Sequence, residues 1–152
     1  DFRSVKLLHS DDEQFSLVFD NETSSWGLFG AEDIELNENQ VENLTRRLED
    51  LAFTGLLEGR PADNDTGRSR LTMMEVLLAN GKIYSLKLGE DENAEGNHVL
   101  SLRMSIRVEA DSPISRREME AFNKRVGDRL FEIRSWEAKD LLKKRAEFLK
   151  EG

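Results

Sequence analysis

Apolar and polar residues alternate most clearly from Leu71 to Leu88, and this alternation predicts a β-hairpin that turns at Asn80-Gly81. A two-residue turn would set Glu75 opposite Leu86, where a buried charge is costly. A three-residue loop, 79–81, with a left-handed glycine as its last residue, avoids this conflict. We therefore adopt the register with the cross-strand pairs Val76 with Tyr84, Met74 with Leu86 and Glu75 with Ser85.

Other short apolar runs predict further strands on both sides of this hairpin. Three runs separated by polar turn formers open the chain, at Val5–Leu8, Phe15–Phe19 and Trp26–Phe29, and they predict an antiparallel meander. After the hairpin, Leu100–Val108 alternates without a break, which predicts a strand with one buried and one solvated face. The hairpin and this strand form a second predicted meander.

Elsewhere the apolar residues recur with a period of 3.6, which predicts amphipathic helices. The first begins at the cap Asn37 and stops at Gly55. The second runs from a cap at Ser115 to Gly127, and a last one from Ser135 to Leu149 follows a short strand at 130–133. The predicted fold class is therefore α+β, with two antiparallel β-meanders, each followed by packed amphipathic helices.

The length of the chain favours one compact domain, 1–152, with sub-halves 1–58 and 71–152 joined by the polar loop 59–70. Each half runs through three strands into a helix. This likeness has two explanations, an old internal duplication or a coincidence of a common α+β pattern, and the residues do not decide between them.

Charge and composition exclude several classes of function. The 31 acidic and 22 basic residues give a net charge of −9, the wrong sign for holding a phosphate backbone, so we expect no nucleic-acid partner. There is no cysteine, so disulfides and thiol nucleophiles are excluded, and no apolar run approaches the 18 or so residues of a membrane span.

Four residues are candidates for an interaction site. Trp26 and Phe29 lie in the third apolar run, where a large aromatic side chain serves either as a packing anchor or as a platform for a ligand. Arg103 and Arg107 share the polar face of the strand predicted at 100–108. They meet either an acidic partner or the carboxylates of neighbouring strands on a solvated face.

The residues indicate no catalytic, cofactor or metal site. The acidic stretch Asp91-x-Asn93-x-Glu95-Gly96 imitates the opening of a calcium-binding EF-hand loop, but its twelfth position is Leu102 instead of a bidentate glutamate. We therefore interpret it as a solvated acidic turn. The only two histidines, His9 and His98, have no spacing with which to share a metal, and no nucleophile elbow or phosphate-binding glycine pattern occurs.

Several hydrophobic-pattern motifs, taken together over most of the chain, resemble those of a known family. They are Trp26-Gly27-Leu28, the helical stripe from Val41 to Leu51, the Asn80-Gly81 turn with its exit Leu86 to Gly89, and the terminal Leu141-Leu142-Lys143-Lys144-Arg145. In this order they resemble the bacterial domain-of-unknown-function family numbered forty-three forty. The resemblance implies a periplasmic or other extracytoplasmic domain, anchored through a membrane segment outside this sequence, in proteins associated with ABC-type transporters and gliding-motility auxiliary proteins.

From these observations we expect a non-enzymatic extracytoplasmic accessory domain that binds another protein, a transporter or an envelope complex. The alternative is a domain that binds a small ligand or glycan on Trp26 or Phe29. A hydrolase would need a pocket with convergent polar groups, which the sequence does not indicate.

Overall fold

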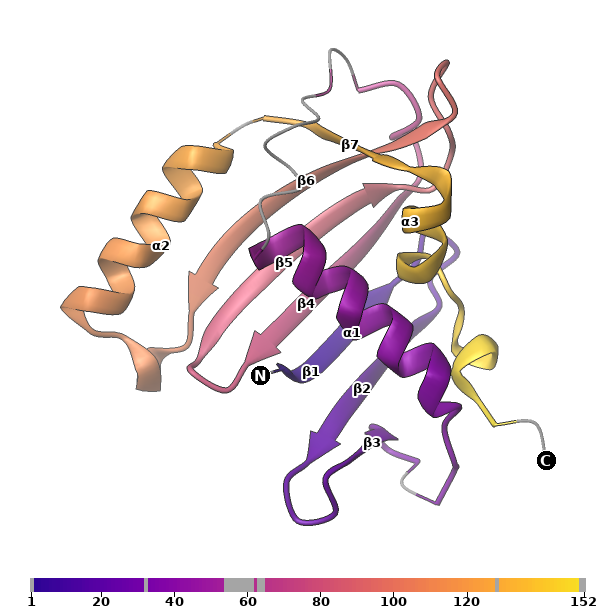
Figure 1. Ribbon diagram of the computed structural model, residues 1–152, viewed down its shortest axis with the longest axis vertical. Helices are drawn as coiled ribbons and strands as arrows, with labels where there is room; N and C mark the ends of the chain where they lie inside the picture. Colours follow the sequence, from indigo (N-terminus) through magenta and orange to yellow (C-terminus); the bar gives the residue numbers. More distant parts are fainter. Residues whose placement is uncertain (1, 32, 54–61, 63–64, 128, 151–152) are drawn as a thin grey trace.

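The computed structural model describes residues 2–31, 33–53, 62, 65–127 and 129–150. In this part of the chain the fold is α+β, with a seven-stranded antiparallel sheet and three α-helices (Figure 1). The strands are β1 (Phe2–Leu8), β2 (Gln14–Asp20), β3 (Ser25–Leu28), β4 (Leu71–Leu78), β5 (Lys82–Gly89), β6 (Asn97–Ile106) and β7 (Phe131–Arg134). The helices are α1 (Glu38–Phe53), α2 (Pro113–Val126) and α3 (Ser135–Leu141), with short 3₁₀ turns at Val108–Ala110 and Arg145–Phe148.

The strands of both predicted sub-halves belong to one sheet, in the order β3-β2-β1-β4-β5-β6-β7. The halves meet where β1 pairs antiparallel with β4, with Val5 opposite Val76. Both of these side chains are buried. The junction is therefore part of the hydrophobic core.

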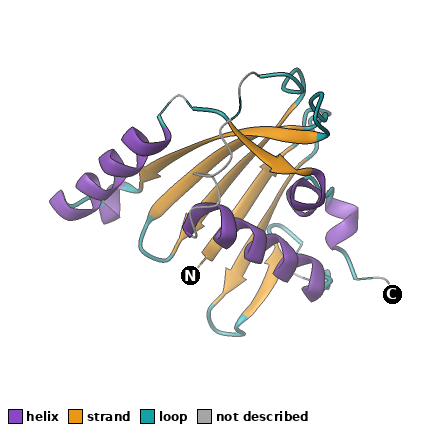
Figure 2. Ribbon diagram, turned by 45° about the horizontal axis from the view of Figure 1, so that its top comes forward, coloured by secondary structure: helices purple, strands orange, loops and turns teal. Residues whose placement is uncertain are grey.

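The helices lie on one face of the sheet, and the other face is open (Figure 2). Along β4 and β6 the side chains alternate between buried and exposed or partly exposed positions. The buried ones, such as Met74 and Leu102, join the same core cluster as the apolar residues of all three helices. This is the arrangement expected for an antiparallel sheet with one solvated face.

The predicted hairpin register is confirmed. Val76 is opposite Tyr84, Met74 is opposite Leu86, and Glu75 is exposed. The last residue of the 79–81 loop, Gly81, has φ = +85°, the left-handed conformation that the three-residue loop requires.

Gly81 also lies in a crowded place, so we expect Gly81→Ala to lower the free energy of unfolding by about 1–3 kcal/mol. A β-carbon at this position would lie 2.2 Å from the Ala110 side chain, and the positive φ would add backbone strain. Gly27→Ala is the matched control, because its β-carbon would meet nothing within 4 Å and its φ is not left-handed. Urea unfolding followed by circular dichroism measures both, and equal effects of the two substitutions would contradict the assigned conformation.

The first helix agrees with the prediction at its start. The side-chain oxygen of Asn37 accepts a hydrogen bond from the Asn39 N–H at 3.1 Å, as a helix cap does. The predicted stop at Gly55 lies outside the described residues, as does most of the first half of the loop 59–70.

The predicted start of the second helix was wrong by three residues. The helix begins at Pro113 and is capped by Ser112, whose side chain accepts from the Ser115 N–H. Proline favours the first helical position because its missing N–H would have no helical partner there. The serine predicted as the cap instead completes a capping box from inside the helix.

The prediction of one continuous helix from Ser135 to Leu149 was also wrong. Helix α3 ends at Leu141, and the chain continues through an extended stretch into the 3₁₀ turn Arg145–Phe148. The backbone carbonyls of Lys143 and Phe148 bond outside this segment, to the His9 ring and the Asn37 N–H respectively. Tertiary hydrogen bonds thus replace helical ones, and they bring Phe148 into the core with no exposed surface.

Candidate functional site

An open groove lies between the β2–β3 hairpin and residues 34–39, the segment that leads into α1. Its volume is about 1390 Å³. Pockets for small molecules are typically about 300–1,000 Å³, so the groove has room for a larger ligand. Apolar side chains of the hairpin and of the 34–39 segment line it, together with several carboxylates.

Strand β3 forms one wall of the groove and is the terminal strand of the sheet, with β2 as its only partner among the described strands. The Phe29 N–H donates to the Ser16 carbonyl at 2.9 Å, so residue 29 faces β2 with its backbone groups. Because these directions alternate along a strand, the backbone groups of Trp26 and Leu28 point to the outer edge. The Leu28 carbonyl accepts from Ala31 N–H at 3.0 Å, which leaves a short edge with backbone donors and an acceptor directed outward.

The structure brings together two of the four predicted site residues at this groove. Trp26 is half-buried against the core, and its ring meets the Phe19 ring edge-on at a centroid distance of 5.5 Å. Phe29 has 74% of its surface exposed, the largest fraction of the exposed large hydrophobic residues in the described part of the chain. One ring therefore anchors the strand, and the other is available to a partner.

The other two predicted site residues, Arg103 and Arg107, do not line the groove. Arg103 is exposed on the open face of β6, opposite Ser85. The prediction that Arg107 belongs to the same strand was wrong, because β6 ends at Ile106. The chain turns there as the Arg107 N–H donates to the Gly81 carbonyl at 2.9 Å, and the Arg107 side chain pairs with Glu109 at 3.5 Å.

The acidic loop after β5 engages its oxygen atoms within the protein. Asp91 pairs with Arg70, and the hydrogen bond from Arg70 holds the pKa of the Asp91 carboxyl below its ordinary value. The Asn93 side-chain oxygen accepts from the backbone N–H groups of Glu95 and Asn97. Within the described residues, no group of three or more histidine, aspartate or glutamate side chains is placed to hold a metal ion.

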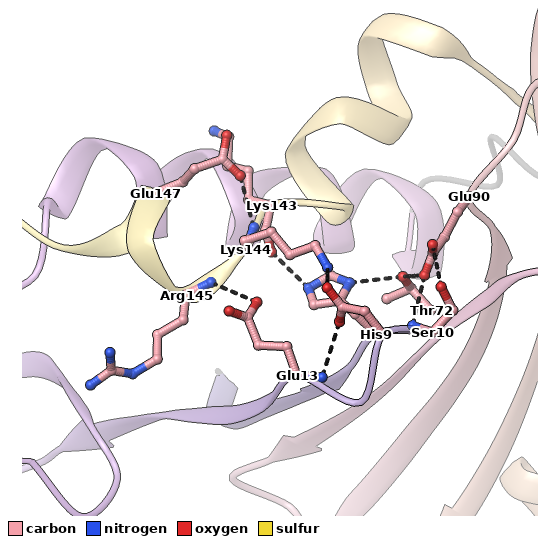
Figure 3. Close-up of polar contacts among 10 residues, drawn as sticks. His9, Ser10, Glu13, Thr72, Glu90, Lys143, Lys144, Arg145 and Glu147 are labelled. Atoms are coloured by element: carbon pink, nitrogen blue, oxygen red, sulfur yellow. Dashed lines mark hydrogen bonds and ion pairs between the residues drawn. The ribbon is translucent and has the colours of Figure 1, made fainter.

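A buried polar network, which the sequence did not indicate, lies at the turn between β1 and β2 (Figure 3). His9 is 2% exposed; its Nδ1 lies 2.9 Å from the Thr72 hydroxyl and its Nε2 lies 2.9 Å from the Lys143 carbonyl oxygen. The Thr72 hydroxyl donates to Glu90 at 2.8 Å, and Ser10 donates to the same carboxylate from both its backbone N–H and its hydroxyl.

These contacts lower the pKa of the Glu90 carboxyl and set the direction of the neighbouring hydrogen bonds. Burial acts to raise the pKa of Glu90, but the hydrogen bonds from Ser10 and Thr72 and the nearby charge of His9 outweigh it and leave the pKa lowered. Glu90 is therefore ionised, and the single hydroxyl proton of Thr72 is given to it. The Nε2 of His9 donates to the Lys143 carbonyl oxygen, which can only accept, and its Nδ1 faces the Thr72 hydroxyl.

The network connects the C-terminal segment to the sheet and, through it, to the groove. Beside the His9 contact, the Lys144 side chain pairs with Asp11, and the Arg145 N–H donates to Glu13 at 3.2 Å. Further on, Leu149 bridges to Leu36, and the Lys150 N–H donates to the Glu35 carbonyl at 3.0 Å. The 34–39 wall of the groove is thus held by the same segment that the network fixes.

Comparison with known proteins adds no relative. No family model matches the chain, and neither a curated protein nor a solved structure matches it. None of the helices in the described ranges has the length and apolar character needed to cross a membrane.

Proposed function

We propose that this chain is a protein-binding domain that receives an extended segment of a partner along the outer edge of β3. The observation that supports this most directly is a terminal strand with outward-directed backbone groups beside a groove, next to the exposed Phe29 ring. Addition of a strand to a sheet edge is a common mode of peptide recognition, in which backbone hydrogen bonds give affinity and side-chain pockets give specificity.

We propose further that the domain is not an enzyme. The sequence has no cysteine and no recognisable nucleophile motif. The two histidines, the usual acid–base groups near neutral pH, are both buried, and their rings bond to Thr72, Lys143 and Gly89 inside the protein.

The identity of the partner is a separate proposal, which rests on the family resemblance alone. We propose an extracytoplasmic domain of a membrane-anchored protein that binds an ABC-type transporter or another envelope complex. A pull-down from solubilised membranes with the whole parent protein tests it. Recovery of transporter subunits supports the proposal, and a consistent absence of envelope proteins from the recovered material contradicts it.

The binding surface itself is tested by replacing Phe29 with a photo-crosslinking phenylalanine analogue. We expect light-dependent crosslinks to a protein in extracts of the source cells, because Phe29 is 74% exposed beside the groove. The control places the same analogue at Ile114, which is 67% exposed in α2, away from the groove. We expect Phe29→Ala to weaken binding of the crosslinked protein at least about tenfold, since aromatic anchors at an interface contribute about 2 kcal/mol or more.

Equal crosslinking from positions 29 and 114, or unchanged affinity in Phe29→Ala, would place the interaction elsewhere on the molecule.

The second candidate function is the binding of a small ligand or glycan on the exposed Phe29 ring. This ring is available as a stacking platform, whereas Trp26 is partly covered by the core. Glycan-array binding that Phe29→Ala removes, without any crosslinked protein, would favour this candidate.

The duplication of two meanders, each followed by helices, also stays a proposal. What supports it is the repeated order of three strands and a helix, β1 to α1 and β4 to α2. Superposition of the two units, with the strands matching in direction and register, is the measurement that checks it.

A further inference from the structure

The charge along the groove bears on the chemistry of its partner. Four carboxylates and one ammonium group line the groove, namely those of Asp20, Glu22, Glu35, Glu38 and Lys150. Resting on the proposed function, we infer that the segment bound along β3 is cationic, an extended peptide in which lysine or arginine alternates with apolar residues.

Two of these carboxylates are already used within the protein. Asp20 accepts the Glu22 backbone N–H at 2.9 Å and so stabilises the turn between β2 and β3. Glu35 pairs with Lys150 at 3.1 Å, which also neutralises the one cation of the lining. The acidic character presented to a partner therefore comes mainly from the other two side chains.

These two, Glu22 and Glu38, stand at different parts of the groove wall, in the β2–β3 turn and in the first turn of α1. Both are exposed, and neither forms an ion pair with a cation of the described residues. A cationic partner could form ion pairs with both carboxylates, and no existing ion pair within the protein would have to be broken first.

The apolar part of the groove explains why we expect apolar residues to alternate with lysine or arginine in the bound peptide. In a strand added to β3, successive side chains point to opposite faces, and residues of the same face repeat about every 7 Å. One set can contact the Trp26 and Ile34 side chains of the groove, while the other set remains solvated and reaches the carboxylates at its margins. Electrostatic complementarity of this kind sets partner choice and association rate.

The test measures binding of three fluorescently labelled peptides by anisotropy: Lys-Val-Lys-Val-Lys-Val, Thr-Val-Thr-Val-Thr-Val and Glu-Val-Glu-Val-Glu-Val. At 50 mM NaCl we expect the lysine peptide to bind at least about tenfold more tightly than the threonine peptide, and the glutamate peptide more weakly than both. At 500 mM NaCl the lysine advantage should fall to about threefold or less, because exposed charges are then screened.

Matched charge variants locate the effect. The double variant Glu22→Gln/Glu38→Gln should lose most of the lysine preference while still binding the threonine peptide. The control Glu49→Gln/Glu75→Gln removes the same charge from exposed positions outside the groove and should leave the preference unchanged.

Each other outcome overturns a defined part of the inference. Equal binding of all three peptides, or a preference lost equally in both double variants, refutes the cationic partner but leaves strand addition in place. If no peptide binds, both the cationic partner and the proposed strand addition fail.

Discussion

Replacing Phe148 with alanine should lower the free energy of unfolding by about 3–5 kcal/mol, as is typical of a large aromatic residue deleted from a core. Phe148 has no exposed surface, and its ring packs against Phe15 with a centroid distance of 5.7 Å. Its carbonyl also accepts the Asn37 N–H at 2.7 Å, at the residue that caps α1. The substitution removes the side chain that holds the C-terminal turn in place, and total stabilities of about 5–15 kcal/mol leave little margin for such a loss.

Urea unfolding monitored by circular dichroism measures this effect, and the control is Phe29→Ala. The two substitutions delete the same side chain, but Phe29 is 74% exposed, so its loss should change stability by no more than about 0.5 kcal/mol. Similar losses in the two variants would mean that the C-terminal segment does not pack as described. The control also establishes that Phe29→Ala is folded, which the binding experiments require.

The parts of the fold that local residues determine were predictable. The hairpin register followed from turn chemistry and from the cost of burying Glu75, both of which operate within 18 residues of sequence. The stripe of α1 and its cap at Asn37 followed from helical periodicity in the same way. These features agree with the structure because tertiary contacts reinforce the local preference.

The C-terminal segment shows why other parts were not predictable. Residues 135–149 have helical periodicity, yet the helix ends at Leu141 because Lys143 and Phe148 give their carbonyls to His9 and Asn37, more than 100 residues earlier. No local pattern carries such pairings. The same reason explains why Phe148 was not expected in the core.

In the candidate site, too, the residues that a local sequence pattern indicates were predictable, and those that tertiary contacts bring together were not. Trp26 and Phe29 could be named as candidates because aromatic residues beside glycines in a short apolar run are conspicuous in the sequence, and both line the groove. The network of His9, Thr72 and Glu90 was missed because its members come from three separate segments and each is an ordinary residue for its position. The position of His9 near the end of a predicted strand did not indicate that both ring nitrogens would be hydrogen-bonded inside the protein.

Replacing Thr72 with valine should cost about 2 kcal/mol or more, although the two side chains have nearly the same shape. Thr72 is 1% exposed and bonds both the His9 ring and Glu90, so valine leaves Nδ1 of the buried His9 without this partner and removes one hydrogen bond from the partly exposed Glu90. Each unsatisfied buried polar group costs about 1–3 kcal/mol. Thr23→Val, at an exposed turn position, is the control and should stay within about 0.5 kcal/mol of the parent.

Nitrogen-15 NMR of the His9 ring tests the proton assignment directly. In the unsubstituted protein Nε2 should show the chemical shift of a protonated nitrogen, because its partner, the Lys143 carbonyl oxygen, can only accept a hydrogen bond. An unprotonated Nε2 would contradict the hydrogen bond between the His9 ring and the Lys143 carbonyl.

The acid side of the stability profile should depend on Glu90. Its pKa in the folded protein lies below the ordinary value of 4.5, so its contribution to stability is complete above pH 4.5 and is lost as the pH falls through the folded pKa. Glu90→Gln should therefore be less stable than the parent at pH 7, and the difference should shrink as the pH falls below about 4.5. Glu75→Gln, an exposed change on the open face, should stay within about 0.5 kcal/mol of the parent at pH 7. A constant difference between Glu90→Gln and the parent from pH 7 to pH 3 would contradict an ionised Glu90.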